Sequence, residues 1–325
     1  MHSFGARALG LVLGLAADSL LGDPRRWHPV AGFGTGAQVL ERWLYRDSRT
    51  AGVLHTAAST TVPVALGLAA ERVGRGRPAT ATALTALATW TVLGGTSLAR
   101  EGSRMAELLE TGDLDEARRR LPHLCARDPS HLDQEELARA TVESLAENTS
   151  DAVVAPLCWG AVAGIPGLLG YRAVNTLDAM VGYRSARYRR FGWAAARLDD
   201  ALNLVPARLT GLLTVACAAA VGGSPVRAWR VLRRDGGRHP SPNAGRPEAA
   251  AAGALGVRLG GSNRYHGQME TRPELGDGPP PAVPDVRRAV RLGRLVAVGA
   301  IAVTAGVALA AGRARAASER HTDGR

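Results

Sequence analysis

An all-α, polytopic integral membrane protein is the fold class that this sequence predicts, and three observations support it. First, 46% of the 325 residues are hydrophobic but only 4% are aromatic, so Ala, Leu and Val supply the apolar content in blocks. Second, several blocks are about 20 residues long, the length of a helix that crosses a bilayer. Third, polar helical segments and a Gly- and Pro-rich loop region separate the blocks. We expect residues 1–325 to form a single membrane-embedded domain.

The apolar blocks predict the spans in order along the chain. Residues 4–21 lack a small-residue cleavage site and run directly into a polar segment, so we interpret them as an uncleaved span rather than a signal peptide. An Arg-rich connector joins the next two blocks, which predicts a transmembrane hairpin. The expected spans are residues 4–21, 51–70, 79–99, 205–223 and 292–311.

Residues 152–170 are also long enough to span, but Pro156, Gly164 and Pro166 interrupt them. They form either a simple span or a re-entrant segment, which is tolerated only where other parts of the protein cover it. An active site shared by the polar clusters on both flanks argues for the re-entrant arrangement. The Arg-rich tail, residues 312–325, is expected to be disordered.

The charge excludes some functions and suggests others. The formal net charge is +11, and all 40 residues counted as Lys or Arg are Arg. A nucleic-acid-binding protein would gather them on one face near stacking aromatic residues, whereas here they are spread over the polar segments. We therefore expect membrane-flanking and anion-binding roles and no nucleic-acid partner. The absence of Lys excludes a Walker A loop and a lysine Schiff base.

Three clusters of acids and amides predict a site between residues 127 and 208. On the helix that Asp133 and Glu136 are placed to cap, Glu143, Glu147 and Asp151 follow at i, i+4 and i+8 and so share one face. Like charges at this spacing repel unless a cation lies between them. The alternative to a binding site is an acidic helix face that is simply exposed to solvent. The clusters are Glu143, Glu147, Asn148 and Asp151; Asn175 and Asp178; and Asp199, Asp200 and Asn203.

Arginines interspersed among these acids complete the pattern. A divalent cation held by carboxylates attracts a phosphate group, and Arg binds the remaining phosphate oxygens. The pattern therefore predicts a site for Mg²⁺ and a phosphate-bearing substrate. The arginines are Arg127, Arg172, Arg197 and Arg208.

Five motifs together resemble the CobD/CbiB family of cobalamin biosynthesis. They are DSLLGDPRRWHPV, ATVESLAENTSDAVVAPL, YRAVNTLDAMVGYR, ARLDDALNLVPARLT and HPSPNAGRPEAAAAGALGVRLGG, and they keep the family's order over residues 10–278. Small departures from the family pattern occur at Cys158, Ala179 and Ser262, and none removes an acid or an amide.

The resemblance implies an adenosylcobinamide-phosphate synthase, a multi-pass protein of the cell membrane whose active site faces the cytoplasm. Its substrates would be adenosylcobyric acid, a corrinoid, and aminopropanol or its O-phosphate. Amide-bond formation would consume ATP and use Mg²⁺. Other cobalamin-pathway enzymes are candidate partners.

We assign hypothetical roles to the motif residues. Six acids are expected to be catalytic and to hold Mg²⁺, and four arginines are expected to contact phosphate. Four asparagines would orient substrate amides or phosphate. One glycine belongs to the SPNAG turn, which opens onto a helix N-terminus and could offer backbone N–H groups to an anion. One of two histidines would be the general base. In that order the residues are Glu143, Glu147, Asp151, Asp178, Asp199 and Asp200; Arg127, Arg172, Arg197 and Arg208; Asn148, Asn175, Asn203, Asn243 and Gly245; and His28 and His239.

Two other classes of protein remain as alternatives. A membrane transporter would place acids inside long spans and show an internal repeat, but the acids lie at span edges and no repeat is convincing. A metal-dependent alcohol-phosphate or prenyl transferase of the membrane would explain Asp199, Asp200 and Asn203. It would not explain the HPSPNAG loop.

Overall fold

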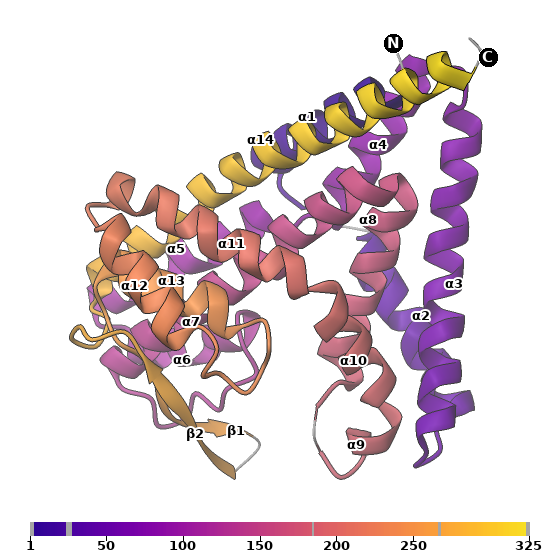
Figure 1. The fold of residues 1–325 in the computed structure, drawn as a ribbon. Helices are drawn as coiled ribbons and strands as arrows, with labels where there is room; N and C mark the ends of the chain where they lie inside the picture. Colours follow the sequence, from indigo (N-terminus) through magenta and orange to yellow (C-terminus); the bar gives the residue numbers. More distant parts are fainter. Residues whose placement is uncertain (1–2, 24–27, 184, 266–267, 323–325) are drawn as a thin grey trace. The chain divides into compact units, whose positions relative to one another are not determined.

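The computed structural model describes residues 3–23, 28–183, 185–265 and 268–322 (Figure 1). Helices form nearly all of its regular structure, and the described residues contain one small antiparallel sheet of two strands. The predicted all-α class is confirmed. The chain divides into two compact units, each built from segments distant in the sequence. Unit 1 comprises Met1–Gly94, Ala155–Leu202 and Ile301–Arg325, and unit 2 comprises Gly95–Val154 and Asn203–Ala300.

Among the described residues, five helical segments are long and apolar enough to cross a membrane. Four of the expected spans, residues 4–21, 51–70, 205–223 and 292–311, fall on these segments, which supports a multi-pass membrane protein. The five segments are Phe4–Leu21, Arg49–Gly74, Gln134–Val181, Leu204–Val221 and Val283–Ala314.

The expected span at residues 79–99 is not one helix in the structure. Helix α4 (Pro78–Val92) ends before Leu93 and Gly94, and α5 (Gly95–Thr111) begins the second unit. Two adjacent glycines are poor helix formers, which favours a break at this point. The sequence after the break is rich in charged residues, so the continuous apolar helix is shorter than the predicted span at residues 79–99.

The segment at residues 152–170 is helical but interrupted. A π-helix over Ser150–Val154 joins α7 (Gln134–Thr149) to α8 (Ala155–Val181), and Gly164 within α8 is non-helical with φ 66° and ψ −147°. Glycine adopts a positive φ at little energetic cost because it has no Cβ. Whether the segment spans or re-enters the bilayer stays a prediction. The last helix, α14 (Val283–Thr322), continues into the tail that the sequence predicted to be disordered.

Small residues let the helices of unit 1 approach closely. Helix α1 (Ser3–Leu21) packs on α4, where a Cβ on Gly10 would lie 2.5 Å from the Cβ of Thr85. Helix α3 (Arg49–Gly74) packs on α8, where a Cβ on Gly67 would lie 2.6 Å from the Cα of Pro166. Close backbone approach of this kind replaces the hydrophobic effect as the packing force in lipid. Unit 1 also contains α2 (Pro29–Leu44), α9 (Tyr188–Phe191) and α10 (Trp193–Leu202).

Unit 2 surrounds helix α7, which starts as expected from its sequence. Asp133 Oδ1 accepts the N–H of Glu136 at 2.8 Å, and the Glu136 carboxylate accepts the N–H of Asp133 at 3.1 Å, which completes the predicted capping box. The other elements of unit 2 are α5, α6 (Leu114–Arg120), α11 (Leu204–Cys217), α12 (Pro225–Asp235), α13 (Gly245–Leu255), β1 (Leu259–Tyr265), β2 (Gln268–Leu275) and the first part of α14.

A buried aspartate ties α12 to the end of the hairpin in unit 2. The Asp235 side chain is fully buried and accepts hydrogen bonds from Arg234 Nε at 2.8 Å and from the backbone N–H of Gly276 at 2.9 Å. Arg234 also donates to Asp277. The hydrogen bond from Arg234 holds the pKa of Asp235 below its usual value. This network positions β1 and β2 (register Leu259 opposite Leu275) beside α12.

Candidate functional site

A buried ion pair lies at the centre of unit 2. Arg127 Nη2 donates to Glu143 Oε2 at 2.5 Å, and the two side chains are only 2% and 7% exposed. The second oxygen of Glu143 accepts the backbone N–H of Gly260 at 2.6 Å, and Arg139 donates to the Gly260 carbonyl. Helix α7, the segment before it and strand β1 therefore meet at one carboxylate. The sequence predicted that Arg127 and Glu143 belong to one site. The structure brings the two side chains into contact, and their role in such a site stays a prediction.

Glu248 joins this centre, although the sequence analysis did not assign it a role. It lies on α13, where nearly every residue is buried, and is itself only 2% exposed. Its Oε1 is buried without a hydrogen-bond partner among the described residues. Burial raises the pKa of Glu248 well above its usual value, the negative charges of Glu147 and Glu143 raise it further, and Arg272 and Arg127 oppose the shift.

We call these five residues, Arg127, Glu143, Glu147, Glu248 and Arg272, the carboxylate centre. It holds three acids and two arginines, so it carries excess negative charge when all are ionised. The signal for Glu248 was available in the sequence, since a lone acid stands before a run of alanines in RPEAAAAGAL. A carboxylate in such apolar surroundings is expensive unless it has a function or a partner.

The rest of the first predicted cluster is arranged differently. Asn148 Nδ2 donates to the carbonyl and the hydroxyl of Ser144, both at 2.9 Å, so this amide is engaged on its own helix. The π-helix that begins at Ser150 adds a residue to the turn. Asp151 therefore does not continue the regular i, i+4, i+8 stripe from Glu143 and Glu147.

The SPNAG loop of unit 2 folds back on itself. His239 Nδ1 accepts the N–H of Ser241 at 3.0 Å, and the Ser241 hydroxyl accepts the N–H groups of Asn243 and Ala244. Two backbone N–H groups of the turn that was predicted to bind an anion are thus directed at the Ser241 hydroxyl. A Cβ on Gly245 would overlap His239, which explains the glycine at the start of α13.

Two further predicted residues lie at the start of α11 in unit 2. Asn203 is buried at the N-cap position, and its side chain makes no capping hydrogen bond. Arg208 is exposed and donates to the carbonyl of Leu204 at 2.7 Å, one turn earlier on its own helix.

Residues of the second and third predicted clusters meet within unit 1. Asn175 Nδ2 on α8 donates to Asp199 Oδ1 on α10 at 3.2 Å, and Arg172 donates to Asn175 Oδ1 at 3.4 Å. Asp199 is 9% exposed. Asp200 pairs with the exposed Arg197 at 3.6 Å, one turn apart on α10.

Asp178 and His28 also belong to unit 1. A Cβ on Gly182 would overlap the Asp178 carboxylate, so the helix end fits closely around this acid. Burial, with the charge of Asp178 adding to it, raises the pKa of Tyr183. His28 Nδ1 accepts the N–H of Val30 at 3.2 Å and caps α2. Both predicted bases, His28 and His239, therefore use Nδ1 as a backbone acceptor, which competes with a role as general base.

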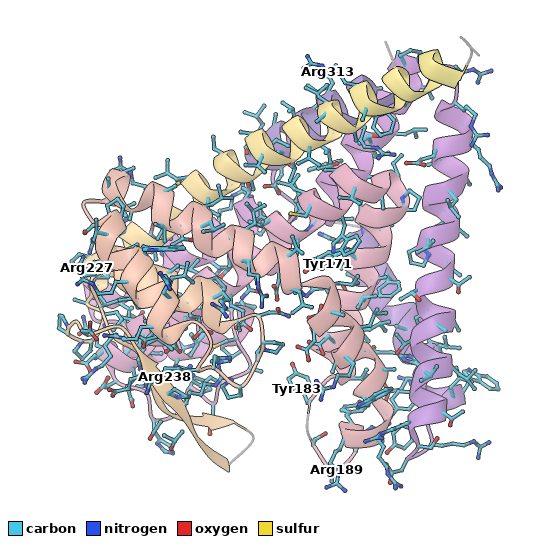
Figure 2. All side chains as sticks on the ribbon, in the orientation of Figure 1. Tyr171, Tyr183, Arg189, Arg227, Arg238 and Arg313 are labelled. Atoms are coloured by element: carbon cyan, nitrogen blue, oxygen red, sulfur yellow. The ribbon has the colours of Figure 1, made fainter. Side chains whose placement is uncertain are left out.

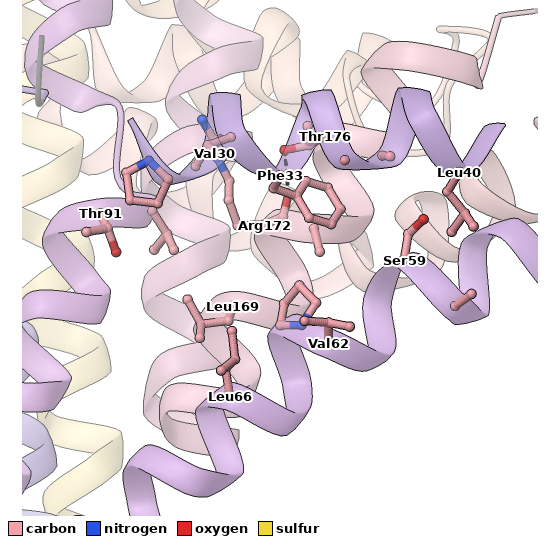
Figure 3. A pocket seen from close by; sticks show the side chains of 17 residues that line it. Val30, Phe33, Leu40, Ser59, Val62, Leu66, Thr91, Leu169, Arg172 and Thr176 are labelled. Atoms are coloured by element: carbon pink, nitrogen blue, oxygen red, sulfur yellow. Dashed lines mark hydrogen bonds between the residues drawn. The ribbon is translucent and has the colours of Figure 1, made fainter. Parts of the chain in front are cut away.

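Arg172 also lines a cavity of about 500 Å³ in unit 1, between α2, α3, α4 and α8 (Figure 3). Its walls are apolar side chains such as Phe33, Val62 and Leu169, with a few hydroxyl groups, and Arg172 is the charged residue of the lining. Such a lining suits a ligand with an apolar body. A triphosphate needs more cationic and hydrogen-bonding groups than this cavity offers.

Within the described residues, no group of three or more His, Cys, Asp or Glu side chains is arranged to hold a metal ion. The expected Mg²⁺ ligands are instead divided between the two units. Glu143, Glu147 and Asp151 lie in unit 2, and Asp178, Asp199 and Asp200 lie in unit 1.

Comparisons with known proteins agree on one family. The family model described as CobD/Cbib protein matches residues 11–293. The cobalamin biosynthesis protein CobD of Mycobacterium tuberculosis is 57% identical over 291 residues, which cover 89% of this chain and 92% of that protein. The proteins of the same name from Geobacter metallireducens (47% identical, 85% of this chain and 88% of that one) and Rhodobacter capsulatus (42%, 87% and 92%) are also similar. No solved structure matches. The chain therefore belongs to the CobD/CbiB family.

Proposed function

We propose that this chain is an adenosylcobinamide-phosphate synthase of cobalamin biosynthesis. It joins aminopropanol, or its O-phosphate, to a propionate side chain of adenosylcobyric acid and consumes ATP. Family membership over most of the chain carries the proposal. The carboxylate centre of unit 2 supports it, because it combines carboxylates and arginines around the buried Arg127, Glu143 and Glu248. We place the protein in the cell membrane with its active site toward the cytoplasm, where ATP is found.

The reaction must activate a carboxylate, which is a poor acyl donor. In the proposed route a propionate oxygen attacks the γ-phosphorus of ATP, the bond to the β–γ bridging oxygen breaks, and ADP leaves. The amine then attacks the carbonyl carbon of the acyl phosphate and phosphate leaves with the C–O bonding electrons. The nitrogen gives up its proton to a base. Both steps require groups that neutralise phosphoryl charge and position the reactants.

The chemistry of the carboxylate centre supports a magnesium ion as part of this proposal. Its acids outnumber its arginines, and an oxygen of Glu248 is buried without a described partner. Mg²⁺ in ATP-dependent enzymes is held by one or two carboxylates together with substrate phosphates and water, so a closed cage of three protein ligands is not needed. Glu147 and Glu248 would hold the ion, which supplies charge neutralisation at the phosphoryl group when bound.

The arginines of the centre have different tasks. Arg127 is engaged with Glu143, so we assign to this pair the positioning of α7 and β1 around the site. Arg272 acts electrostatically on Glu248 from strand β2 and is the better candidate for phosphate contact. In unit 1, Asn175 and Asp199 form a hydrogen-bonded polar pair, and Arg172 donates a hydrogen bond to Asn175.

Product formation by the full-length protein tests the proposal. Purified protein in detergent is supplied with adenosylcobyric acid, ATP and Mg²⁺, with either aminopropanol or its O-phosphate, and the corrinoid product is identified by mass. We expect an amide and stoichiometric ADP. A phosphodiester or prenyl product without ADP, or no amide from well-folded protein in either this assay or complementation of a synthase-deficient bacterium, would refute the proposal.

Variants of the same protein test the site. We expect Glu248→Gln, which keeps the shape of the protonated acid, to lower the rate about 100-fold or more, the scale of losing one electrostatic catalytic group. Glu135→Gln is the matched control, because Glu135 is exposed in the first turn of α7. The double variant Asp199→Ala, Asp200→Ala tests the assigned acids of unit 1 in the same assay. Full activity of these variants would keep the function and reject the assigned residues.

A further inference from the structure

A second cavity of unit 1, of about 420 Å³, lies where α3 connects to α4. Its lining comes from the start of α1, the end of α3, the start of α4 and α8 near Gly164. Three of the lining residues are arginines, Arg7, Arg75 and Arg77, and one is an acid, Glu71. The cavity therefore carries net positive charge.

The charges of this cavity are only partly compensated. Arg7 pairs with Glu71 at 3.2 Å and donates to the carbonyl of Ala161 at 3.3 Å, so it is a fixed part of the wall. Arg75 and Arg77 are exposed, and no side-chain hydrogen bond or ion pair joins either of them to another described residue. Two guanidinium groups at the cavity mouth are thus available to an anion.

The start of α4 adds to the attraction. Arg77 is its N-cap residue without a side-chain capping hydrogen bond, and Pro78 occupies the first turn. Pro78 and Ala81 line the cavity, so the positive end of the helix dipole and the uncapped first turn lie at its wall.

The cavity lies at the polar end of several candidate spans. Helix α1 enters its candidate span at Phe4, α3 leaves its span at Gly74, and both helix ends border the cavity. The candidate span of α14 ends at Ala314, and a Cβ on Gly312 would lie 2.6 Å from the Phe4 side chain. Helix α1 begins and helix α14 ends at this end of unit 1 (Figure 1), and Arg313 adds a further positive charge there (Figure 2). This depth corresponds to the headgroup region of a bilayer.

We propose that this cavity binds the headgroup of an anionic phospholipid. Its phosphate would contact Arg75 and Arg77, and an acyl chain would follow the apolar side chains that α3 exposes, such as Leu66 and Val73. Basic pockets between helices at the membrane surface are suited to such headgroups. Apolar wall residues, including Phe4 and Ile165, favour a lipid over a free phosphate. The proposal depends on membrane insertion and not on the proposed enzymatic function.

Native mass spectrometry of the full-length protein in detergent tests it, with phosphatidylglycerol and phosphatidylcholine titrated separately. We expect one phosphatidylglycerol to bind in preference to phosphatidylcholine. The double variant Arg75→Gln, Arg77→Gln should bind phosphatidylglycerol about 30-fold more weakly, which corresponds to about 2 kcal/mol for two arginines at a membrane surface. Its thermal unfolding without lipid should be unchanged, since both side chains are exposed.

The control removes the same charge elsewhere on unit 1. Arg46 precedes α3 at its other end and Arg189 lies on α9, and both are exposed. The variant Arg46→Gln, Arg189→Gln should keep the preference for phosphatidylglycerol. Equal weakening by both double variants would overturn the cavity as the site. Displacement of the lipid by millimolar glycerol 3-phosphate or inorganic phosphate would overturn a lipid as its ligand, and equal binding of the two lipids would overturn the charge recognition.

Discussion

The buried pair of Arg127 and Glu143 gives the sharpest test of how unit 2 is held together. Substitution of Arg127 by Met keeps most of the side-chain volume but leaves the Glu143 carboxylate buried with the N–H of Gly260 as a remaining donor. At 2.5 Å and an effective dielectric constant of about 20, the Coulomb attraction lost is about 7 kcal/mol before the desolvation of both ions is subtracted. Removal of one member of a buried pair lowers the free energy of unfolding by about 3–5 kcal/mol in net terms.

A double-mutant cycle separates the pair from its surroundings. Glu143→Gln should destabilise by a similar amount, because it leaves the Arg127 charge buried, while its amide oxygen can still accept the N–H of Gly260. The double variant Arg127→Met, Glu143→Gln buries no charge at this place. It should therefore be more stable than the sum of the two single changes predicts, by about 2 kcal/mol or more.

The assay is denaturant unfolding of the detergent-solubilised protein, followed by circular dichroism. The matched control is the pair of Arg104 and Glu107 on α5, which has a similar separation of 2.9 Å but side chains that are 51% and 50% exposed. Its variants Arg104→Met and Glu107→Gln should change the free energy of unfolding by less than about 1 kcal/mol. A loss below about 1 kcal/mol for Arg127→Met, or a coupling energy no larger than that of the exposed pair, would refute the reasoning.

Two further predictions concern packing and pH. A Cβ on Gly52 would overlap the carbonyl oxygen of Phe191, so Gly52→Ala should lower the free energy of unfolding by about 1–3 kcal/mol. A Cβ on Gly32 would have no atom within 4 Å, so Gly32→Ala should raise the free energy of unfolding by up to about 1 kcal/mol. A thermal melt in which Gly52→Ala is the more stable of the two variants would contradict this packing. Asp235→Asn should destabilise by about 2 kcal/mol at pH 7 because it removes a buried carboxylate acceptor. Because the hydrogen bond from Arg234 lowers the pKa of Asp235 in the folded state, its stabilisation is present above about pH 4 and is lost as the pH falls through the folded pKa. Unfolding measured from pH 7 to pH 3 should therefore show a smaller acid loss in Asp235→Asn than in the wild type, and equal losses would exclude this carboxylate as a source of the pH dependence.

Local sequence patterns determined the class of this protein and much of its helical content. Apolar blocks of spanning length fall on four of the five candidate spans, and the block at residues 152–170, predicted to span or re-enter, lies within the fifth. Hydropathy over about 20 residues is a property of one continuous segment. The capping box at Asp133 was predicted for the same reason, because its two partners are three residues apart. Five motifs in their family order predicted the CobD/CbiB family, which the family model confirms.

Only the tertiary structure decided which polar groups share a site. Glu143 meets Arg127, Gly260 and the charge of Glu248 through three segments that are distant in the sequence, and no spacing rule connects them. The π-helix over Ser150–Val154 interrupts the regular α-helical spacing at Asp151, and the break after Val92 ended a helix that composition alone would have continued. Periodicity and propensity describe how one segment is folded and buried, whereas the neighbours of a buried charge depend on loop closure and on packing between segments.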